Sequence, residues 1–464
     1  MYDKRENQHL YLLIFFVTTI SGIFNSIYYF EDIDSLRFAT GIKYGYDIVK
    51  MQPHFPGYPV FHFIASIIYF LTSNLGVTFA IIGSLSIFII IISIIKIIDS
   101  QSQFNYFLIS LIILLNPLFS IMATRYMPDL FGLAICSTIF YFLVFSQYKN
   151  HTILGIFLCG ILIGVRVSYF PLIIIPLIFS IRRSKNFFYS GIVFMVGIII
   201  WLIPLILHQG LESIYQAGFS HTIGHFTEYG GSIFTENNIL LRLKSILHTI
   251  WADGFGGYWT DRSMLTVLIS ISLMMIAKKS FFNYDKIKNQ KLKILIISLL
   301  VYCIWIFFFQ NVIYKSRHIL PIILILIIMM LNFMPIKKYK NQYVTLIILW
   351  SILTINLNID HKAGTAIFKL KNDIKNKNAD YIIGNNLINY YLERNGVKAK
   401  KDFINYHSLN DTIFKEFDKY KIIFIGDYNL IVDKLYKYNF KNKTFYHNPY
   451  MNRMWAEIPI YYNK

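Results

Sequence analysis

Long apolar runs separated by short polar connections constrain this chain more than any other feature of its sequence. Residues 77–98 and 294–309 are long enough, or nearly so, to cross a hydrocarbon core of roughly 30 Å. Hydrophobic residues make up 55% of the chain and charged residues only 15%, and the mean hydropathy is +0.50. The sequence therefore predicts a polytopic membrane protein rather than a set of soluble domains.

The expected fold is mainly α-helical, a bundle of about 11–13 transmembrane helices within residues 1–358. The first apolar stretch is long and lacks a clear small-x-small cleavage site, so we expect an uncleaved helix there. The segments expected to enter the membrane are residues 10–30, 58–73, 76–98, 105–123, 129–146, 151–166, 168–181, 187–208, 264–278, 293–310, 318–334 and 342–358.

Basic residues between the apolar segments indicate the orientation, because cytoplasmic loops carry an excess of Lys and Arg. Lys4 and Arg5 place the N-terminus inside, so the first loop, residues 31–57, is expected outside. Alternation also places the long loop 209–263 and the C-terminal region outside. The basic clusters that mark the inside lie in residues 182–185, 278–293 and 337–340.

The N-terminal half holds one apolar segment too many for this alternation. One of them must fail to cross, and the candidates are residues 58–73, which begin at a proline-rich turn, and the short pair at 151–181.

We expect a multi-pass protein of a bacterial inner (plasma) membrane with its active site facing outside.

The net charge of +19 fits this placement. The Lys and Arg residues gather in short clusters between apolar segments and in the C-terminal region, as contacts with lipid headgroups require. We therefore expect membrane lipid, and no nucleic acid, as a partner. Cys136, Cys159 and Cys303 all lie in apolar segments, so neither a disulfide framework nor a cysteine metal site is indicated.

The texture of the sequence changes after Asp360. Short β-like runs alternate there with helical patterns, which predicts a small α/β domain over residues 359–464. It lacks a Gly-rich phosphate loop, so we expect a structural or acceptor-guiding role. The β-like runs are 381–384, 422–426, 444–447 and 456–462, and the helical patterns are 386–395 and 409–420.

Chemistry is concentrated in the first loop. Glu31, Asp32 and Asp34 follow the first apolar helix, and the turn His54-Phe-Pro-Gly-Tyr-Pro59 returns the chain stiffly to the membrane, since each proline fixes φ. The acids are either a solvated helix cap or a positioned catalytic carboxylate, for which a rigid loop is suited.

The pattern Asp34-Ser-x-x-Phe38-Ala39 followed by this turn resembles the first outer loop of GT-C membrane glycosyltransferases. The similarity is to the protein O-mannosyltransferase-like and aminoarabinose-transferase-like branch. Here Phe55 stands where the usual H-P-P turn has its first proline, and Ser35 replaces a second acid.

The resemblance implies inverting transfer of a sugar from a polyprenyl-phosphate-linked donor to an acceptor hydroxyl on a glycan, lipid or protein. Asp34 matches the family's motif position and would act as general base, with Asp32 as its rival. The phosphate leaving group needs cationic stabilisation as its charge develops.

Candidate phosphate ligands lie at the ends of apolar segments. Arg317 and His318 open a helix on the expected outer side, where free N–H groups also favour a phosphate. Arg166 lies between two short apolar segments, an expensive place for a charge unless it is paired or faces water. Snorkelling or a structural ion pair is the alternative for each arginine. Arg125 and His54 complete this set.

The long loop adds two weaker patterns. His221 and His225 share one face of a helix and Glu228 follows, so a divalent metal is one alternative to a solvated or substrate-contacting loop, and no cofactor is otherwise indicated. Residues 254–262 combine glycines and aromatics with Arg262, either as a cover over substrate or as an interfacial aromatic belt.

Two other functions fit the same composition. An O-antigen polymerase-like or ligase-like enzyme would rely on arginines of large later loops. A transporter or flippase of lipid-linked glycans would more often show two similar halves and no folded C-terminal domain. The acids of the first loop favour a glycosyltransferase, while the sugar, the acceptor and the lipid chain length stay open.

Overall fold

The chain folds into two compact units in a computed structural model that describes residues 2–99, 102–184, 186–228, 231–281, 289–409, 419–426 and 440–463. The membrane unit comprises Met1–Tyr28 and Arg37–Ile359, and the α/β unit comprises Tyr29–Leu36 and Asp360–Lys464. The sequence-based boundary at residue 358 stays a prediction. The start of the first loop, Tyr29–Leu36, packs with the C-terminal residues as part of the α/β unit.

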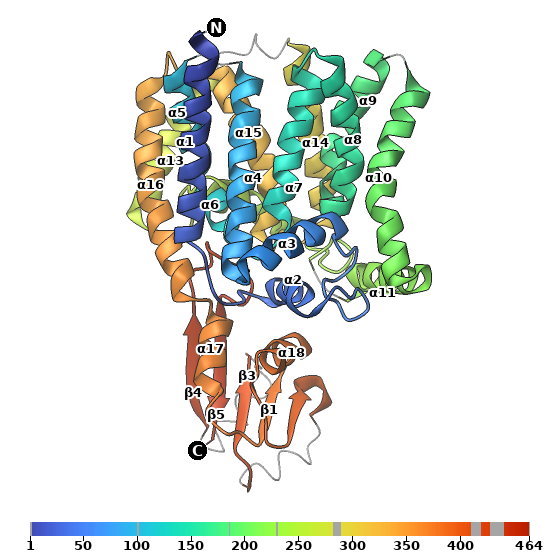
Figure 1. Ribbon diagram of the computed structural model, residues 1–464. Coiled ribbons are helices and arrows are strands. Elements are labelled where there is room, and N and C mark those ends of the chain that lie inside the picture. The colour runs from blue at the N-terminus through green and yellow to red at the C-terminus, as the bar shows by residue number, and fades with distance from the viewer. Residues whose placement is uncertain are drawn as a thin grey trace. The chain divides into compact units, whose positions relative to one another are not determined.

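The membrane unit is a bundle of apolar helices (Figure 1). Six helical segments of the described residues are long and apolar enough to cross a membrane, and shorter apolar helices accompany them. The helices are α1 (Tyr2–Phe24), α2 (Ile33–Tyr44, which begins in the α/β unit), α3 (Pro59–Thr72), α4 (Leu75–Ile98), α5 (Gln103–Leu114), α6 (Pro117–Met122), α7 (Asp129–Phe140), α8 (Lys149–Arg166), α9 (Phe170–Ser184), α10 (Phe187–Gln209), α11 (Leu211–Thr227), α12 (Ile239–His248), α13 (Met264–Phe281), α14 (Gln290–Phe309), α15 (Leu320–Phe333) and α16 (Lys340–Ala363).

Two helices mark the inside and the edge of this bundle. The segment Ser316–Phe333, which contains α15, has 83% of its most apolar window buried by other helices, whereas α10 has only 17%. A helix that is apolar on all sides either fills a core or faces lipid. Figure 1 accordingly draws α10 at the edge of the bundle, a position that suits a helix with apolar residues on its exposed faces.

The fold favours α3 as the surplus N-terminal segment. α3 has 14 residues and follows the proline-rich turn directly. In Figure 1 it lies across the end of the bundle near the start of α4. Without α3, the crossings before Arg182 are made by α1, α4, α5, α7, α8 and α9, an even number that returns Arg182 to the side of the N-terminus.

The α/β unit contains a five-stranded sheet in the order β2-β1-β3-β5-β4. β1 pairs in parallel with β2 and β3, whereas β5 pairs antiparallel with β3 and β4. The strands are β1 (Tyr381–Gly384), β2 (Asp402–Asn405), β3 (Ile422–Ile425), β4 (Lys441–Tyr446) and β5 (Glu457–Tyr462), with helices α17 (Ala366–Ile374) and α18 (Asn386–Arg394).

The predicted strands and the helix at 386–395 of this unit are confirmed. The predicted helix at 409–420 lies largely outside the described residues. β2 was missed, because its burial is only partial and the polar residues Asp402 and Asn405 bound it.

The start of the first loop is built into the core of the α/β unit. Ile33 and Leu36 are buried in one hydrophobic cluster with Ile367 and Leu370 of α17. Tyr391 of α18 donates a hydrogen bond to the Phe30 carbonyl at 2.5 Å. Residues of α17 and α18, far away in the sequence, therefore hold the backbone around the acids of this loop in place.

Candidate functional site

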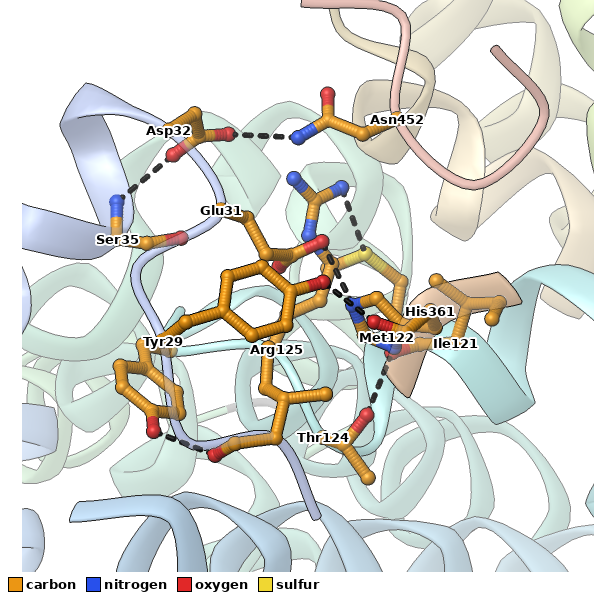
Figure 2. Close-up of polar contacts among 12 residues, drawn as sticks. Tyr29, Glu31, Asp32, Ser35, Ile121, Met122, Thr124, Arg125, His361 and Asn452 are labelled. Atoms are coloured by element: carbon orange, nitrogen blue, oxygen red, sulfur yellow. Dashed lines mark hydrogen bonds and ion pairs between the residues drawn. The ribbon is translucent and has the colours of Figure 1, made fainter. Parts of the chain in front are cut away.

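Glu31 is the first of the three acids, and it is fully buried in the α/β unit. Its Oε1 lies 2.7 Å from His361 Nε2, and Tyr29 donates to the carbonyl of the same histidine at 2.5 Å (Figure 2). A carboxylate removed from water in this way requires such a partner. Glu31 is therefore a structural tie between the first loop and the end of α16.

Asp32 is a helix cap. Its Oδ1 accepts the backbone N–H of Ser35 at 2.8 Å (Figure 2). Its carbonyl accepts the N–H of Leu36. Asn452 donates to Oδ2 at 3.2 Å. These contacts are those of an N-cap aspartate at the start of α2, which satisfies otherwise unpaired helix donors.

Asp34 lies within the first turn of α2 and is buried, with 3% of its surface exposed. The helix N-terminus stabilises a carboxylate there. Asp32 and Asp34, the two predicted catalytic acids, thus lie at the start of the same helix, α2. The Asp32 side chain caps the backbone of its first turn.

The membrane unit contains a buried cluster of opposite charges where the starts of α7 and α15 meet the end of α8. Arg166 Nη2 lies 2.9 Å from Asp129 Oδ1, and Arg317 Nε approaches the same oxygen at 3.8 Å. All three side chains are at most 7% exposed. The two guanidiniums of this cation cluster, Arg166 and Arg317 beside Asp129, are donors of the kind that bind a phosphate.

The turn that returns the first loop to the bundle joins this cation cluster. Arg166 Nη1 donates to the Tyr58 hydroxyl at 3.1 Å, and that hydroxyl lies 3.1 Å from His54 Nε2. The ring of Phe38 packs edge-on against both His54 and Tyr58. The rigid turn predicted from the prolines thus holds a polar chain that runs from His54 to Asp129.

Other predicted phosphate ligands are held elsewhere. Arg125 is buried in the turn between α6 and α7, with Nη1 3.9 Å from Met122 Sδ (Figure 2). His318 is buried beside Arg317, and its carbonyl accepts the Tyr302 hydroxyl at 3.1 Å. Arg262 forms a buried ion pair with Asp253 at 2.7 Å and also donates to the Ala252 carbonyl.

The metal candidates of the long loop point to different partners. The His221 ring stacks on His54 with centroids 5.5 Å apart, whereas His225 Nε2 lies 2.7 Å from the Phe309 carbonyl. Glu228 is exposed at the end of α11. Among the described residues, no group of three His, Cys, Asp or Glu side chains lies close enough to hold a metal ion.

Several residues of these sites were missed by sequence reasoning. The missed partners are Asp129 of α7, Tyr58 at the end of the first loop and His361 of α16. Their contacts follow from the packing of these segments and cannot be read from the sequence. Arg242 on α12 was not singled out, although it is the largest fully buried charged side chain among the described residues. The hint in the sequence was a charge among the leucines of this segment.

The fold of the chain is similar to that of ArnT, in agreement with the aminoarabinose-transferase-like resemblance of the first loop. Two crystal structures of ArnT from Cupriavidus metallidurans share the fold, one bound to undecaprenyl phosphate and one in the apo state. Their TM-scores are 0.54 and 0.55, and in each case 97% of this chain and 97% of that chain are covered at 10% identity. No protein-family profile and no curated sequence matches the chain.

Proposed function

We propose that this protein is an inverting membrane glycosyltransferase that takes a sugar from a polyprenyl-phosphate carrier. The observation that carries the proposal is the full-length fold likeness to ArnT, which binds undecaprenyl phosphate in one of its structures. The buried cation cluster supports it, because a polyprenyl phosphate presents its charge at the end of an apolar chain. The site would face the outside of the inner membrane of a bacterium.

Asp34 is the proposed general base. The acceptor hydroxyl loses its proton to the Asp34 carboxylate as its oxygen attacks the anomeric carbon. The bond from that carbon to the phosphate oxygen breaks, and polyprenyl phosphate leaves with the electron pair. Asp32 is the rival, and its two oxygens accept hydrogen bonds from Ser35 and Asn452 as a helix cap does.

Arg317 and Arg166 are the proposed phosphate ligands. Both guanidiniums lie beside the carboxylate of Asp129, and arginine side chains are suited to stabilise the charge that develops on a phosphate leaving group. His54 belongs to the same polar chain through Tyr58 and would orient Arg166. Arg125, His318 and Arg262 remain candidates that have no contact with this carboxylate in the described hydrogen bonds and ion pairs.

The decisive experiment incubates membranes or purified protein with labelled polyprenyl-phosphate sugars and follows loss of the sugar. Asp34→Asn is expected to abolish transfer, since an amide cannot take the proton, while expression and thermal unfolding stay unchanged. Asp47→Asn is the matched control in the same loop, because its side chain accepts the Val49 and Lys50 N–H groups and pairs with Lys50 Nζ in a surface turn. Full activity of a purified Asp34→Asn protein would refute the assignment.

Asp32→Asn separates the two acids. Asparagine caps a helix about as well as aspartate, so this variant is expected to keep both the fold and the transfer activity. If Asp32→Asn abolishes transfer and Asp34→Asn does not, the rival assignment holds. Movement of an intact lipid-linked sugar across the membrane, without its cleavage, would instead indicate the transporter alternative.

A further inference from the structure

The outer end of α14 is closed by an unusual set of donors. The last four carbonyls of an α-helix have no partner within the helix. Here the last turn of α11, the loop between α11 and α12, and α12 itself supply partners for them. The Ile233 N–H donates to the Phe308 carbonyl at 3.2 Å, and His225 Nε2 lies 2.7 Å from the Phe309 carbonyl.

Arg242 provides the remaining contacts. Its Nε and Nη2 donate to the Phe307 carbonyl at 2.9 and 2.7 Å, and Nη2 reaches the Gln310 carbonyl at 3.0 Å. Its Nη1 donates to the Gly231 carbonyl at 2.6 Å. A cation at a helix C-terminus is favoured by the helix dipole as well as by these hydrogen bonds. We call residues 231–242 together with His225 the clasp.

The surroundings of Arg242 make this contact obligatory. α12 is inverted in polarity: Arg242 and Ser245 are buried, whereas Leu240 and Leu247 are 76% and 62% exposed. Such a helix suits lipid on its outer face, because exposed leucines are unfavourable in water. A guanidinium on its inner face has little water to bind, so its donors must find acceptors in the protein.

The clasp holds the segment that carries Arg317. Gln310, whose carbonyl Arg242 binds, begins the connection from α14 to α15. At the other end of this connection, Tyr302 of α14 donates to the His318 carbonyl at 3.1 Å. The backbone on both sides of Arg317 is thus tied to α14, and this path leads to the 3.8 Å approach of Arg317 to Asp129.

We propose that Arg242 is a positioning residue, which caps α14 through the clasp and thereby holds Arg317 at the cation cluster. The consequence for the donor phosphate rests on the proposed function. The consequence for the backbone of residues 310–319 does not. The two are therefore measured separately, by affinity for undecaprenyl phosphate and by amide hydrogen exchange of the full-length protein.

Arg242→Met removes every donor and keeps the apolar stem. We expect exchange across residues 310–319 to rise about tenfold or more, in line with the loss of several charge-assisted hydrogen bonds. Affinity for undecaprenyl phosphate should fall about tenfold, with a raised donor KM and a nearly unchanged kcat. Arg242→Lys should lie between, because an ammonium cannot serve these carbonyls as a planar fork does.

Lys244→Met is the matched control, since Lys244 lies on the exposed face of the same helix and its loss should change neither quantity. If Arg242→Met fails to fold, Gly231→Ala offers a milder opening of the clasp. Gly231 has φ +85°, and a Cβ there would meet the Asn311 side chain at 2.2 Å. Gly231→Ala should raise exchange over the same residues.

Unchanged exchange at 310–319 in both Arg242→Met and Gly231→Ala would overturn the proposal. So would faster exchange spread evenly over the whole membrane unit, which indicates general destabilisation instead. If the wild-type protein does not bind undecaprenyl phosphate, the proposed function fails, and hydrogen exchange still decides the role of Arg242.

Discussion

Asp129 and Arg166 form the shortest ion pair of the cation cluster, and the stability of the cluster depends on both side chains. Neutralising Asp129 leaves Arg166 and Arg317 buried without their shared carboxylate. Removal of one partner from a buried ion pair costs about 3–5 kcal/mol, much of it from the charge left behind. The same contact holds Arg166 toward Tyr58.

Asp129→Asn is therefore expected to lower the free energy of unfolding by about 3–5 kcal/mol. Thermal unfolding of the detergent-purified protein measures this loss. Asp129→Asn combined with Arg166→Met should recover part of it, because the uncompensated charge is gone. A double variant no more stable than Asp129→Asn alone would contradict the pairing.

At the scale of elements, α17 and β4 of the α/β unit are joined by Asp373. Its carboxylate lies 2.8 Å from Lys377 Nζ and 2.6 Å from Lys443 Nζ. Partial burial alone would raise the pKa of Asp373, but hydrogen bonds from Lys377 and Lys443 outweigh it and hold the pKa below its usual value. A lowered folded-state pKa contributes stability above the ordinary pKa, and that stability is lost as the pH falls through the folded value.

Asp373→Asn should accordingly destabilise the protein at pH 7 by about 1 kcal/mol or less, since these side chains are partly exposed. The difference from wild type should vanish as the pH falls below the usual range of an aspartate. The pH dependence of the unfolding midpoint tests this expectation. Glu393→Gln, on an exposed position of α18, serves as control. A difference that persists at acid pH would rule out the charge interaction as its cause.

At the scale of the whole molecule, the two segments that form the α/β unit constrain how often the chain between them can cross the membrane. Tyr29–Leu36 and Asp360–Lys464 form one compact unit, and a single folded unit cannot lie on both sides of a bilayer. The chain between them must then cross an even number of times, which agrees with α3 not crossing. The first loop and the C-terminal unit therefore share a side, and the basic loops predict that this side is the outside.

Cysteine labelling of intact cells tests this topology in variants that lack the three native cysteines. Val49→Cys in the first loop and Lys398→Cys in the α/β unit, both exposed, should react with a membrane-impermeant maleimide. Lys338→Cys, in an expected cytoplasmic loop, should react only after the membrane is permeabilised. Labelling of Val49→Cys without Lys398→Cys would separate the two regions and contradict the single unit.

The sequence by itself determined the membrane bundle, four of the five described strands of the C-terminal unit and the loop that carries the acids. Hydropathy, periodicity and turn residues act over windows of a few to about twenty residues, so they can be read locally. The surplus segment was narrowed to residues 58–73 or the pair at 151–181, and the position of α3 across the end of the bundle in Figure 1 then favoured the first of these.

Tertiary structure alone decided which charges meet. Glu31 contacts His361, which lies some 330 residues later in the chain. Asp129 pairs with Arg166 of a neighbouring helix. Arg242 caps α14, which begins well after it in the sequence. A buried charge takes its partner from whichever segment the packing brings near, and that choice depends on all the helices at once. For this reason the sequence pointed to the acids of the first loop, while their separate roles became distinguishable only in the fold.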